Sequence, residues 1–380
     1  MHFEQRPSRQ GGVLIHGVDT TAAAAVAQRF AAHLQTLGLD SLVACGSETS
    51  PTGSALRFWL NDASVQRWAP GYNTLELCTQ CGLDTLRQPD DLAREIILAM
   101  LLGPVAFEFP DLDEWLAAIR IRQNIVHAAR KTSLAFHTSE AERPEDYWAY
   151  SPATGFTILP GTCLIDALCK ATQPDVSGKL YSFSCYRASE YVILLSIAQE
   201  LRASNPALLH ALQQHYEKQA IQSGKFHDVF LREYGSMEQP LPPKYYVPGD
   251  RLWFRNPDEH SSDVSGYEGS WVFYLGGGLF CNFWNHAQPF TLSAKCIEIY
   301  HWRHATYVDP AGDLRIDETI VAHRVADTQR DPLAVQNIFE QMLRLREPKG
   351  VYQHGGCIDT TREYPRWVRP GTSDMVLPRL

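Results

Sequence analysis

The sequence has no apolar run long enough to cross a bilayer: the best candidate, residues 96–106, falls far short of the roughly 20 residues that a spanning helix needs. It also lacks an excess of positive charge, because 34 Lys and Arg stand against 43 Asp and Glu and leave a formal net charge of −9. This balance argues against nucleic-acid binding by phosphate neutralisation. Residues 1–12 are not followed by an apolar leader with a cleavage site. We therefore expect a cytoplasmic protein that binds neither membrane nor nucleic acid.

The sequence also lacks the signs of a disulfide or metal framework. Its nine cysteines are an odd number in a chain of 380 residues, which is typical of reduced thiols. Cys78 and Cys81 form a single Cys-x-x-Cys, and no second ligand pair lies nearby to complete a four-ligand zinc site. The pair is open to two interpretations, a redox pair or two unrelated buried thiols, and we favour the second. We expect no metal.

What is present is the composition of an ordinary globular protein, with 44% hydrophobic and 20% charged residues. Residues 1–104 begin with a strand–helix–strand pattern and form a predicted N-terminal α/β extension, to which the sequence assigns no role. In residues 105–346 helices come first and antiparallel strands follow, which predicts the α+β class. Residues 347–380 carry Pro, Gly and charge, and are predicted to be a C-terminal tail.

One cysteine stands where chemistry is expected. The strand-like segment 180–184 gives way to a long helical pattern at Cys185, and Ser182 or Ser184 is a candidate helix cap. The unpaired N–H groups and the positive end of the helix would lower the pKa of this thiol and favour the nucleophilic thiolate. Arg187 adds positive charge nearby. The alternative is a buried structural cysteine.

A cysteine nucleophile needs a base, and a predicted hairpin supplies a candidate among the fourteen histidines. If Gly276 to Gly278 form the turn, the strands on either side pair so that Glu268 lies directly opposite His286. Opposed side chains have Cβ atoms roughly 4.5–5.5 Å apart. A carboxylate at that distance can orient an imidazole that serves Cys185. A bulge in the turn would shift this register, and a surface charge pair is the alternative interpretation.

Several ordered blocks carry a family resemblance. They are the helical segment 116–129, Tyr147-Trp148 with Gly155-Phe156, the segment 180–185, and the Gly-Asp … Phe-Arg-Asn-Pro run in 248–258. Together they resemble the spore-associated type of bacterial protein-glutamine gamma-glutamyltransferase, a calcium-independent transglutaminase, over about residues 105–304. The resemblance implies a papain-like (NlpC/P60-like) core, in which the catalytic cysteine stands at a helix N-terminus packed on an antiparallel sheet.

The resemblance also implies a set of site residues. The family uses a cysteine, a glutamate and a histidine in that order, and Cys185 matches the cysteine. An ungapped match places Ser270 and Phe283 at the positions of the glutamate and the histidine. Lengthening both arms of the hairpin instead places Glu268 and His286 there. We favour the second placement because similar additions to both arms preserve cross-strand pairing.

The activity that the resemblance implies is acyl transfer. The thiolate would attack a glutamine carboxamide, release ammonia and form a thioester, which an amine such as a lysine side chain would convert into an amide (isopeptide) bond. The partners would be a protein acyl donor and an amine acceptor. Neither a metal nor an organic cofactor is required.

Three other functions remain open. A transglutaminase-like acyltransferase could take its acyl group from a carrier-protein thioester in natural-product biosynthesis. The long region 1–104 and the aromatic residues Trp271, Phe283 and Trp284 in the hairpin favour it. A protease or amidase, with water as the acceptor, is chemically adjacent. Alternatively, if Ser270 and Phe283 occupy the site, the chain would be a catalytically degenerate binding or structural relative.

Overall fold

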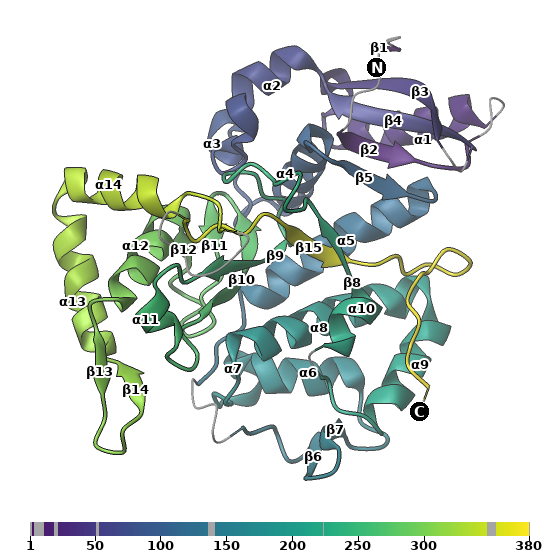
Figure 1. The fold of residues 1–380 in the computed structure, drawn as a ribbon. Helices are drawn as coiled ribbons and strands as arrows, with labels where there is room; N and C mark the ends of the chain where they lie inside the picture. The colour runs from purple at the N-terminus through teal and green to yellow at the C-terminus, as the bar shows by residue number, and fades with distance from the viewer. Residues whose placement is uncertain are drawn as a thin grey trace.

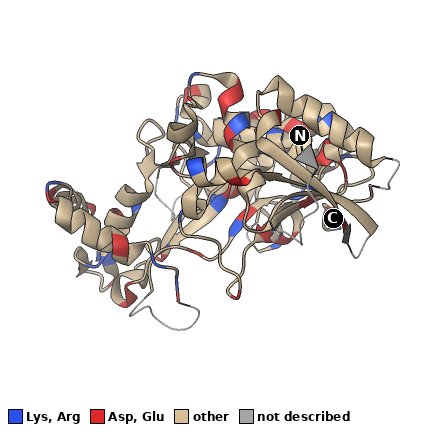
Figure 2. Ribbon diagram, turned by 90° about the horizontal axis from the view of Figure 1, so that it is seen from above, with Lys and Arg blue, Asp and Glu red and all other residues tan. Residues whose placement is uncertain are grey.

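The structure is a computed structural model that describes residues 2–3, 11–18, 22–50, 53–135, 141–222, 224–347 and 355–379. Two sheets and a layer of helices organise it (Figure 1). The first sheet lies at the top of that view, the buried helices lie below it, and the helices α13 (Glu318–Gln329) and α14 (Pro332–Met342) lie at the left. Basic and acidic residues are interspersed along the ribbon in Figure 2.

The first sheet has five strands in the order β1-β3-β4-β2-β5. Its strands are β1 (His2–Phe3), β2 (Gly12–Ile15), β3 (Val43–Ser50), β4 (Gly53–Leu60) and β5 (Ala106–Phe109). The associated helices are α1 (Ala23–Thr36), η1 (Asp40–Leu42), α2 (Asp62–Trp68), η2 (Pro70–Tyr72), α3 (Leu77–Cys81) and α4 (Pro89–Leu102). Phe30 of α1 stacks on Phe58 of β4 at 3.7 Å and on Trp115 at 4.4 Å between ring centroids. This aromatic stack joins the sheet to the helices beneath it.

The helical layer is built around two long helices, α5 (Leu112–Ala129) and α8 (Cys185–Ser204). These two helices pack against each other, and Arg120 of α5 donates to both carboxylate oxygens of Glu200 of α8, at 2.9 and 2.7 Å. Smaller elements complete the layer: β6 (Trp148–Ser151), β7 (Gly155–Ile158), α6 (Leu164–Thr172), α7 (Pro174–Ser177), α9 (Pro206–Tyr216) and α10 (Lys225–Phe230). Both long helices contribute apolar residues to one continuous core.

The second sheet has six strands in the order β12-β11-β10-β9-β15-β8, and all of its pairs are antiparallel. Its strands are β8 (Leu231–Tyr234), β9 (Arg251–Arg255), β10 (Gly269–Gly276), β11 (Leu279–Phe280), β12 (Phe290–Thr291) and β15 (Arg362–Pro365). The remaining elements are α11 (Glu259–Ser262), α12 (Leu292–Trp302), the hairpin β13 (Thr306–Val308) and β14 (Leu314–Ile316), α13 (Glu318–Gln329) and α14 (Pro332–Met342). The predicted mixture of helices with an antiparallel sheet is therefore confirmed.

The Gly-Asp pair of the sequence motif ties this sheet to α5. Asp250 is fully buried and accepts from the buried guanidinium of Arg122 at 2.8 Å, and the Tyr234 hydroxyl donates to it as well. Gly249 has a φ of +87°, and a Cβ at this position would lie 2.9 Å from Arg122. A buried ion pair is stable only when further hydrogen bonds, such as that from Tyr234, satisfy its charged groups. The glycine is therefore needed both for its backbone angle and for the close approach of the arginine.

The predicted segment boundaries do not follow the sheets. β5 lies beyond residue 104, yet it pairs in parallel with β2 of the N-terminal sheet. β15 lies in the predicted C-terminal tail, yet it pairs with both β8 and β9 inside the second sheet. The segment that contains β15 is thus part of the core rather than a loosely packed addition. Where the chain divides into domains stays a prediction.

Candidate active site

Cys185 begins α8, as the sequence predicted. Ser184 is the cap: its backbone is extended, with φ −78° and ψ 154°, and its hydroxyl accepts the N–H of Arg187 at 3.2 Å. The preceding segment is held in place by a short parallel contact, in which Phe183 donates to Ala135 at 3.2 Å. These interactions fix the position at which the chain turns into the helix.

The environment of the Cys185 sulfur shifts the pKa of the thiol in two opposite directions. The residue is partly accessible to solvent, but protein atoms surround it densely, and burial raises the pKa of the thiol above its ordinary value. The backbone N–H of Trp271 on β10, the charge of Lys295 and the N–H groups at the helix start all lower this pKa. The N–H groups at the helix start thus lower the pKa as predicted, but the cost of burying a thiolate is the larger effect and leaves the pKa above its ordinary value.

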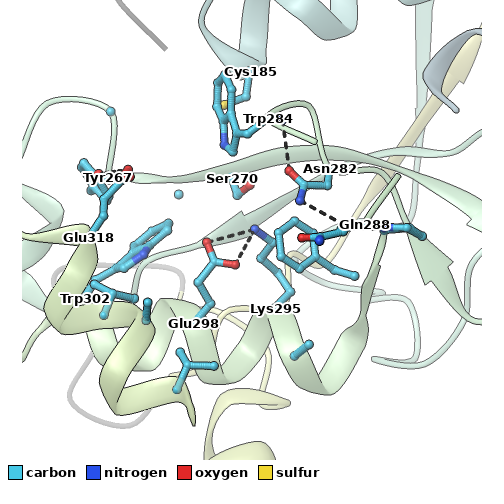
Figure 3. Close-up of a pocket in the computed structure, with 18 of the residues that line it drawn as sticks. Cys185, Tyr267, Ser270, Asn282, Trp284, Gln288, Lys295, Glu298, Trp302 and Glu318 are labelled. Atoms are coloured by element: carbon cyan, nitrogen blue, oxygen red, sulfur yellow. Dashed lines mark hydrogen bonds and ion pairs between the residues drawn. The ribbon is translucent and has the colours of Figure 1, made fainter. Parts of the chain in front are cut away.

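A cavity of about 730 Å³ opens beside Cys185 (Figure 3). Its walls come from the start of α8, from β10, from the loop 281–289, and from α12 and α13. The larger side chains that line it are Tyr267, Asn282, Trp284, Gln288, Phe290, Lys295, Glu298, Trp302, Glu318, Val321, Val325 and Gln329. This volume is typical of a small-molecule pocket, and its lining combines aromatic surface with a few polar groups.

Two oppositely charged residues of α12 lie in the wall of this cavity. Lys295 is 3% exposed, and its Nζ donates to both carboxylate oxygens of Glu298, at 3.2 and 3.1 Å. The same Nζ lies 3.7 Å from the centroid of the Phe290 ring. Figure 3 shows the pair reaching from α12 into the space that also holds Ser270 and Cys185. The predicted site residues do not include this pair, although a Lys and a Glu three residues apart on a largely apolar helix could have indicated it.

The predicted pairing of Glu268 with His286 is wrong. β10 and β11 do pair, but a bulge separates the Tyr274–Phe280 pair from the Gly276–Leu279 pair, and β11 ends at Phe280. Beyond it the side chain of Asn282 accepts the N–H groups of Trp284 and Asn285, at 3.0 and 3.3 Å. This cap bends the chain out of the ribbon before it reaches His286.

Neither residue of that predicted pair lines the cavity. The exposed Glu268 carboxylate accepts the N–H of Gly266, with its oxygens at 3.2 and 3.1 Å. The Nδ1 of His286 lies 2.7 Å from the hydroxyl of Ser133, and the same hydroxyl accepts the His286 backbone N–H at 2.9 Å. The structure therefore does not bring Cys185, Glu268 and His286 together around the cavity. Catalytic roles for Glu268 and His286 stay predictions.

The residues of the ungapped match are placed differently. Ser270 lies on β10 and lines the cavity with Cys185. Phe283 is buried, and its carbonyl oxygen accepts the N–H of Leu134 at 2.8 Å. The ungapped placement therefore describes the position of Ser270 better than the lengthened hairpin describes that of Glu268.

Two features are absent from the residues that the structure describes, a membrane-spanning helix and a cluster of three or more metal-ligating side chains. Among these residues, no helix has both the length and the apolar character required for a bilayer crossing. Within the same ranges, no group of three or more His, Cys, Asp or Glu side chains is arranged to hold a metal ion. The cytoplasmic location stays a prediction.

Comparisons with known proteins agree with the resemblance seen in the sequence. The curated protein-glutamine gamma-glutamyltransferase of Bacillus licheniformis is 24% identical over 173 residues, which make up 43% of this chain and 62% of the relative. The chain thus matches less than two thirds of that relative's length. A solved transglutaminase from Geobacillus stearothermophilus aligns with a TM-score of 0.39 and 20% identity, covering 57% of this chain and 98% of that one. The model of the protein-glutamine gamma-glutamyltransferase family matches residues 77–376, and the chain belongs to this family.

Proposed function

We propose that the chain is a cysteine acyltransferase of the transglutaminase type, with Cys185 as its nucleophile. The observation that carries this proposal is the position of Cys185, at the start of a capped helix and open to a cavity of about 730 Å³, in a chain of this family. A nucleophile at a helix start has backbone N–H groups close to the bond that reacts. A papain-like core belongs to the same proposal. It is supported by the packing of the start of α8 on β10, where the rings of Tyr186 and Trp271 lie 5.2 Å apart between centroids.

The proposed reaction has two balanced steps. In the first, the sulfur forms a bond to the carbonyl carbon of a glutamine side chain, the carbon–nitrogen bond breaks, and ammonia leaves with the proton of the thiol. In the second, the nitrogen of a primary amine bonds to the thioester carbon, the carbon–sulfur bond breaks, and a proton of the amine returns to the sulfur. The N–H of Cys185 and one further donor would stabilise the oxyanion in both steps.

The experiment uses the full purified chain with a glutamine-rich protein and a fluorescent primary amine. We expect fluorescence to become covalently attached to the protein, and Cys185→Ala to abolish the attachment. Cys163→Ala is the matched control, because Cys163 is an exposed cysteine that does not line the cavity. Equal incorporation by the wild type and Cys185→Ala would refute the proposal.

The aromatic lining of the cavity favours a second candidate, acyl transfer from a carrier-protein thioester. The rings of Trp284, Phe290 and Trp302 and the side chains of Val321 and Val325 offer more apolar surface than a glutamine side chain can cover. Intact-protein mass spectrometry after mixing the chain with an acyl-carrier thioester would test it. Acylation of Cys185 by the thioester, without amine incorporation into the glutamine-rich protein, would favour this donor. Failure of both assays would favour a degenerate relative.

A further inference from the structure

The charged groups that line the cavity beside Cys185 bear on the ionisation of its thiol. Among the described residues that line it, the charged side chains are Lys295, Glu298 and Glu318, and no histidine is present. A cysteine nucleophile reacts as the thiolate, and burial opposes the thiolate form. Some positive group must therefore offset burial if this thiol is to ionise near neutral pH.

We propose that Lys295, held by Glu298 and Phe290, is the counter-charge that stabilises the thiolate of Cys185 in place of an imidazolium. The inference rests on the proposed function for its biological meaning, but it concerns a property of the sulfur that can be measured separately. Ionisation releases the thiol proton to solvent. The leaving ammonia recovers a proton from solvent, so the overall balance of acyl transfer is unchanged.

The surroundings of Lys295 support this role. A nearly buried ammonium is costly unless it is paired, and Lys295 has both a bidentate carboxylate and an aromatic ring as partners. These contacts remove the freedom that a lysine side chain ordinarily has at a protein surface. A positive charge fixed in the wall of a partly desolvated cavity acts more strongly on a nearby anion than a mobile surface charge does.

The charge of Lys295 acts on the thiols of three cysteines, Cys185, Cys281 and Cys296. The charge of Lys295 lowers the pKa of Cys185, against the opposing effect of burial. It also lowers the pKa of Cys281, but burial dominates there and raises the pKa of that thiol to about 12. Cys281 is fully enclosed, whereas Cys185 borders the cavity. Cys296 is also fully buried and does not line the cavity. Of the three thiols whose pKa the Lys295 charge lowers, Cys185 is therefore the one that a substrate can reach.

Other titratable groups face the same space. Glu298 extends from α12 itself, Glu318 from the start of α13, and Tyr267 from the chain before β10, where its hydroxyl donates to Glu318 at 2.8 Å. Burial raises the pKa of Tyr267 well above its ordinary value, and the Glu318 carboxylate raises it further. The phenol is therefore neutral near pH 7. Lys295 is thus the cation among these groups, and the Glu298 carboxylate opposes its effect on the sulfur.

Glu298 makes the proposal sharply testable, because the two partners of the ion pair must act with opposite sign. Removal of the Lys295 charge disfavours the thiolate, whereas removal of the Glu298 charge leaves the ammonium unopposed and favours it. If the pair only held α12 in place, both substitutions would disturb Cys185 in the same direction. Glu298 is therefore a positioning residue, and its loss should change the ionisation of Cys185 in the direction opposite to the loss of Lys295.

The experiment measures the rate of Cys185 alkylation by iodoacetamide from pH 6 to 10, with peptide mapping to separate Cys185 from Cys281. We expect Lys295→Met to slow alkylation at pH 7.5 by about five- to thirtyfold and to move the profile to higher pH. We expect Lys295→Arg to stay within about threefold of the wild type, because it keeps the charge. Glu298→Gln should accelerate alkylation and move the profile to lower pH.

Matched controls separate electrostatics from folding. Lys179 forms an exposed ion pair with Glu142 at 2.8 Å outside the cavity, so Lys179→Met should leave the profile unchanged. The double variant Lys295→Met/Glu298→Gln removes the pair as a unit and should lie between the two single variants. If Lys295→Met does not fold, as judged by circular dichroism, the shift of Glu298→Gln to lower pH and its reversal in the double variant still decide the question.

Three results would overturn the proposal. The first is a wild-type profile in folded Lys295→Met. The second is a slowing of alkylation by both Lys295→Met and Glu298→Gln. The third is a shift to higher pH caused by His286→Ala but not by Lys295→Met, which would identify an imidazole as the counter-charge. Absence of amine incorporation with opposite alkylation shifts intact would refute the proposed function and leave this inference standing.

Discussion

Cys185 at the start of α8 and Cys78 in α3 are both surrounded by protein, but the charges beside the two sulfurs have opposite sign. Burial raises the pKa of each thiol. At Cys185, the Trp271 N–H and the Lys295 charge oppose burial. At Cys78, the carboxylate of Glu95 adds to burial and drives the pKa far above the ordinary value, against a smaller effect of the Gly277 N–H. Burial is common to both thiols, so the sign of the neighbouring charge decides which one is suited to chemistry.

The residues around Cys78 instead hold two elements of the fold together. Glu95 of α4 is buried, and it accepts the hydroxyl of Tyr274 at 2.9 Å and the N–H of Gly277 at 3.0 Å. A Cβ on Gly276, whose φ is +83°, would lie 2.3 Å from the Glu95 carboxylate. The glycine turn of the second sheet is therefore clamped onto α4. The Cys-x-x-Cys belongs to this junction, and burial also raises the pKa of Cys81, to about 11, which does not favour a redox pair.

Alkylation would show the largest difference between the two thiols. In the folded protein at pH 8, we expect iodoacetamide to modify Cys185 at least about 100-fold faster than Cys78, because Cys78 has almost no thiolate and is buried. In 6 M guanidinium chloride the two rates should converge. Time-resolved peptide mapping measures both sites in one sample. Equal alkylation rates in the folded protein would contradict the expected difference between the two thiols.

Removal of the carboxylate beside Cys78 should destabilise the fold without touching the cavity. Glu95→Ala leaves the Tyr274 hydroxyl and the Gly277 N–H buried without their acceptor, so we expect the free energy of unfolding to fall by about 2–4 kcal/mol. Urea denaturation monitored by tryptophan fluorescence checks this value. Alkylation of Cys185 in the folded variant serves as the control, and a large change there would contradict the separation of the two regions.

The pH dependence of stability should also carry the signature of Glu95. Burial raises the pKa of Glu95 above its ordinary value, so the folded protein holds this proton more tightly than the unfolded chain does. The stability associated with it is present below the unfolded pKa and is lost as the pH rises through the raised folded pKa, by at most about 1.4 kcal/mol per pH unit. Thermal unfolding of the wild type and of Glu95→Gln between pH 4 and 8 compares the two. Glu95→Gln should lack this contribution to the slope of stability against pH. Identical slopes in the two proteins would contradict the assignment of this contribution to Glu95.

The smallest expected effect concerns the helix start at Cys185. Ser184→Ala removes the side-chain cap of α8, which we expect to cost about 1 kcal/mol of unfolding free energy and to slow Cys185 alkylation by about twofold. Asp111→Ala removes the equivalent cap of α5, where the side chain accepts the N–H of Glu114 at 2.8 Å. This control should lose similar stability and leave Cys185 unchanged. Denaturation and alkylation of both variants would test whether the cap supports the thiol specifically.

The elements that could be predicted are those whose causes lie within a few residues along the chain. Ser184 and the apolar pattern that follows it place the start of α8 at Cys185 without any distant partner. The glycines 276–278 likewise lie at the turn between β10 and β11. The failed prediction, Glu268 opposite His286, required the register to persist over many residues. A bulge and the Asn282 cap interrupted it, and their effect depends on how the ribbon packs.

The sequence by itself determined the family, the helix start and the identity of the candidate nucleophile, because ordered motifs and helix caps are local properties. Only the tertiary structure decided that β15 enters the second sheet, that Glu268 and His286 do not line the cavity, and that Lys295 and Glu298 do. It also decided that burial outweighs the helix start at the Cys185 thiol. Desolvation and charge proximity depend on atoms that packing brings together from distant parts of the chain, and no local pattern encodes them.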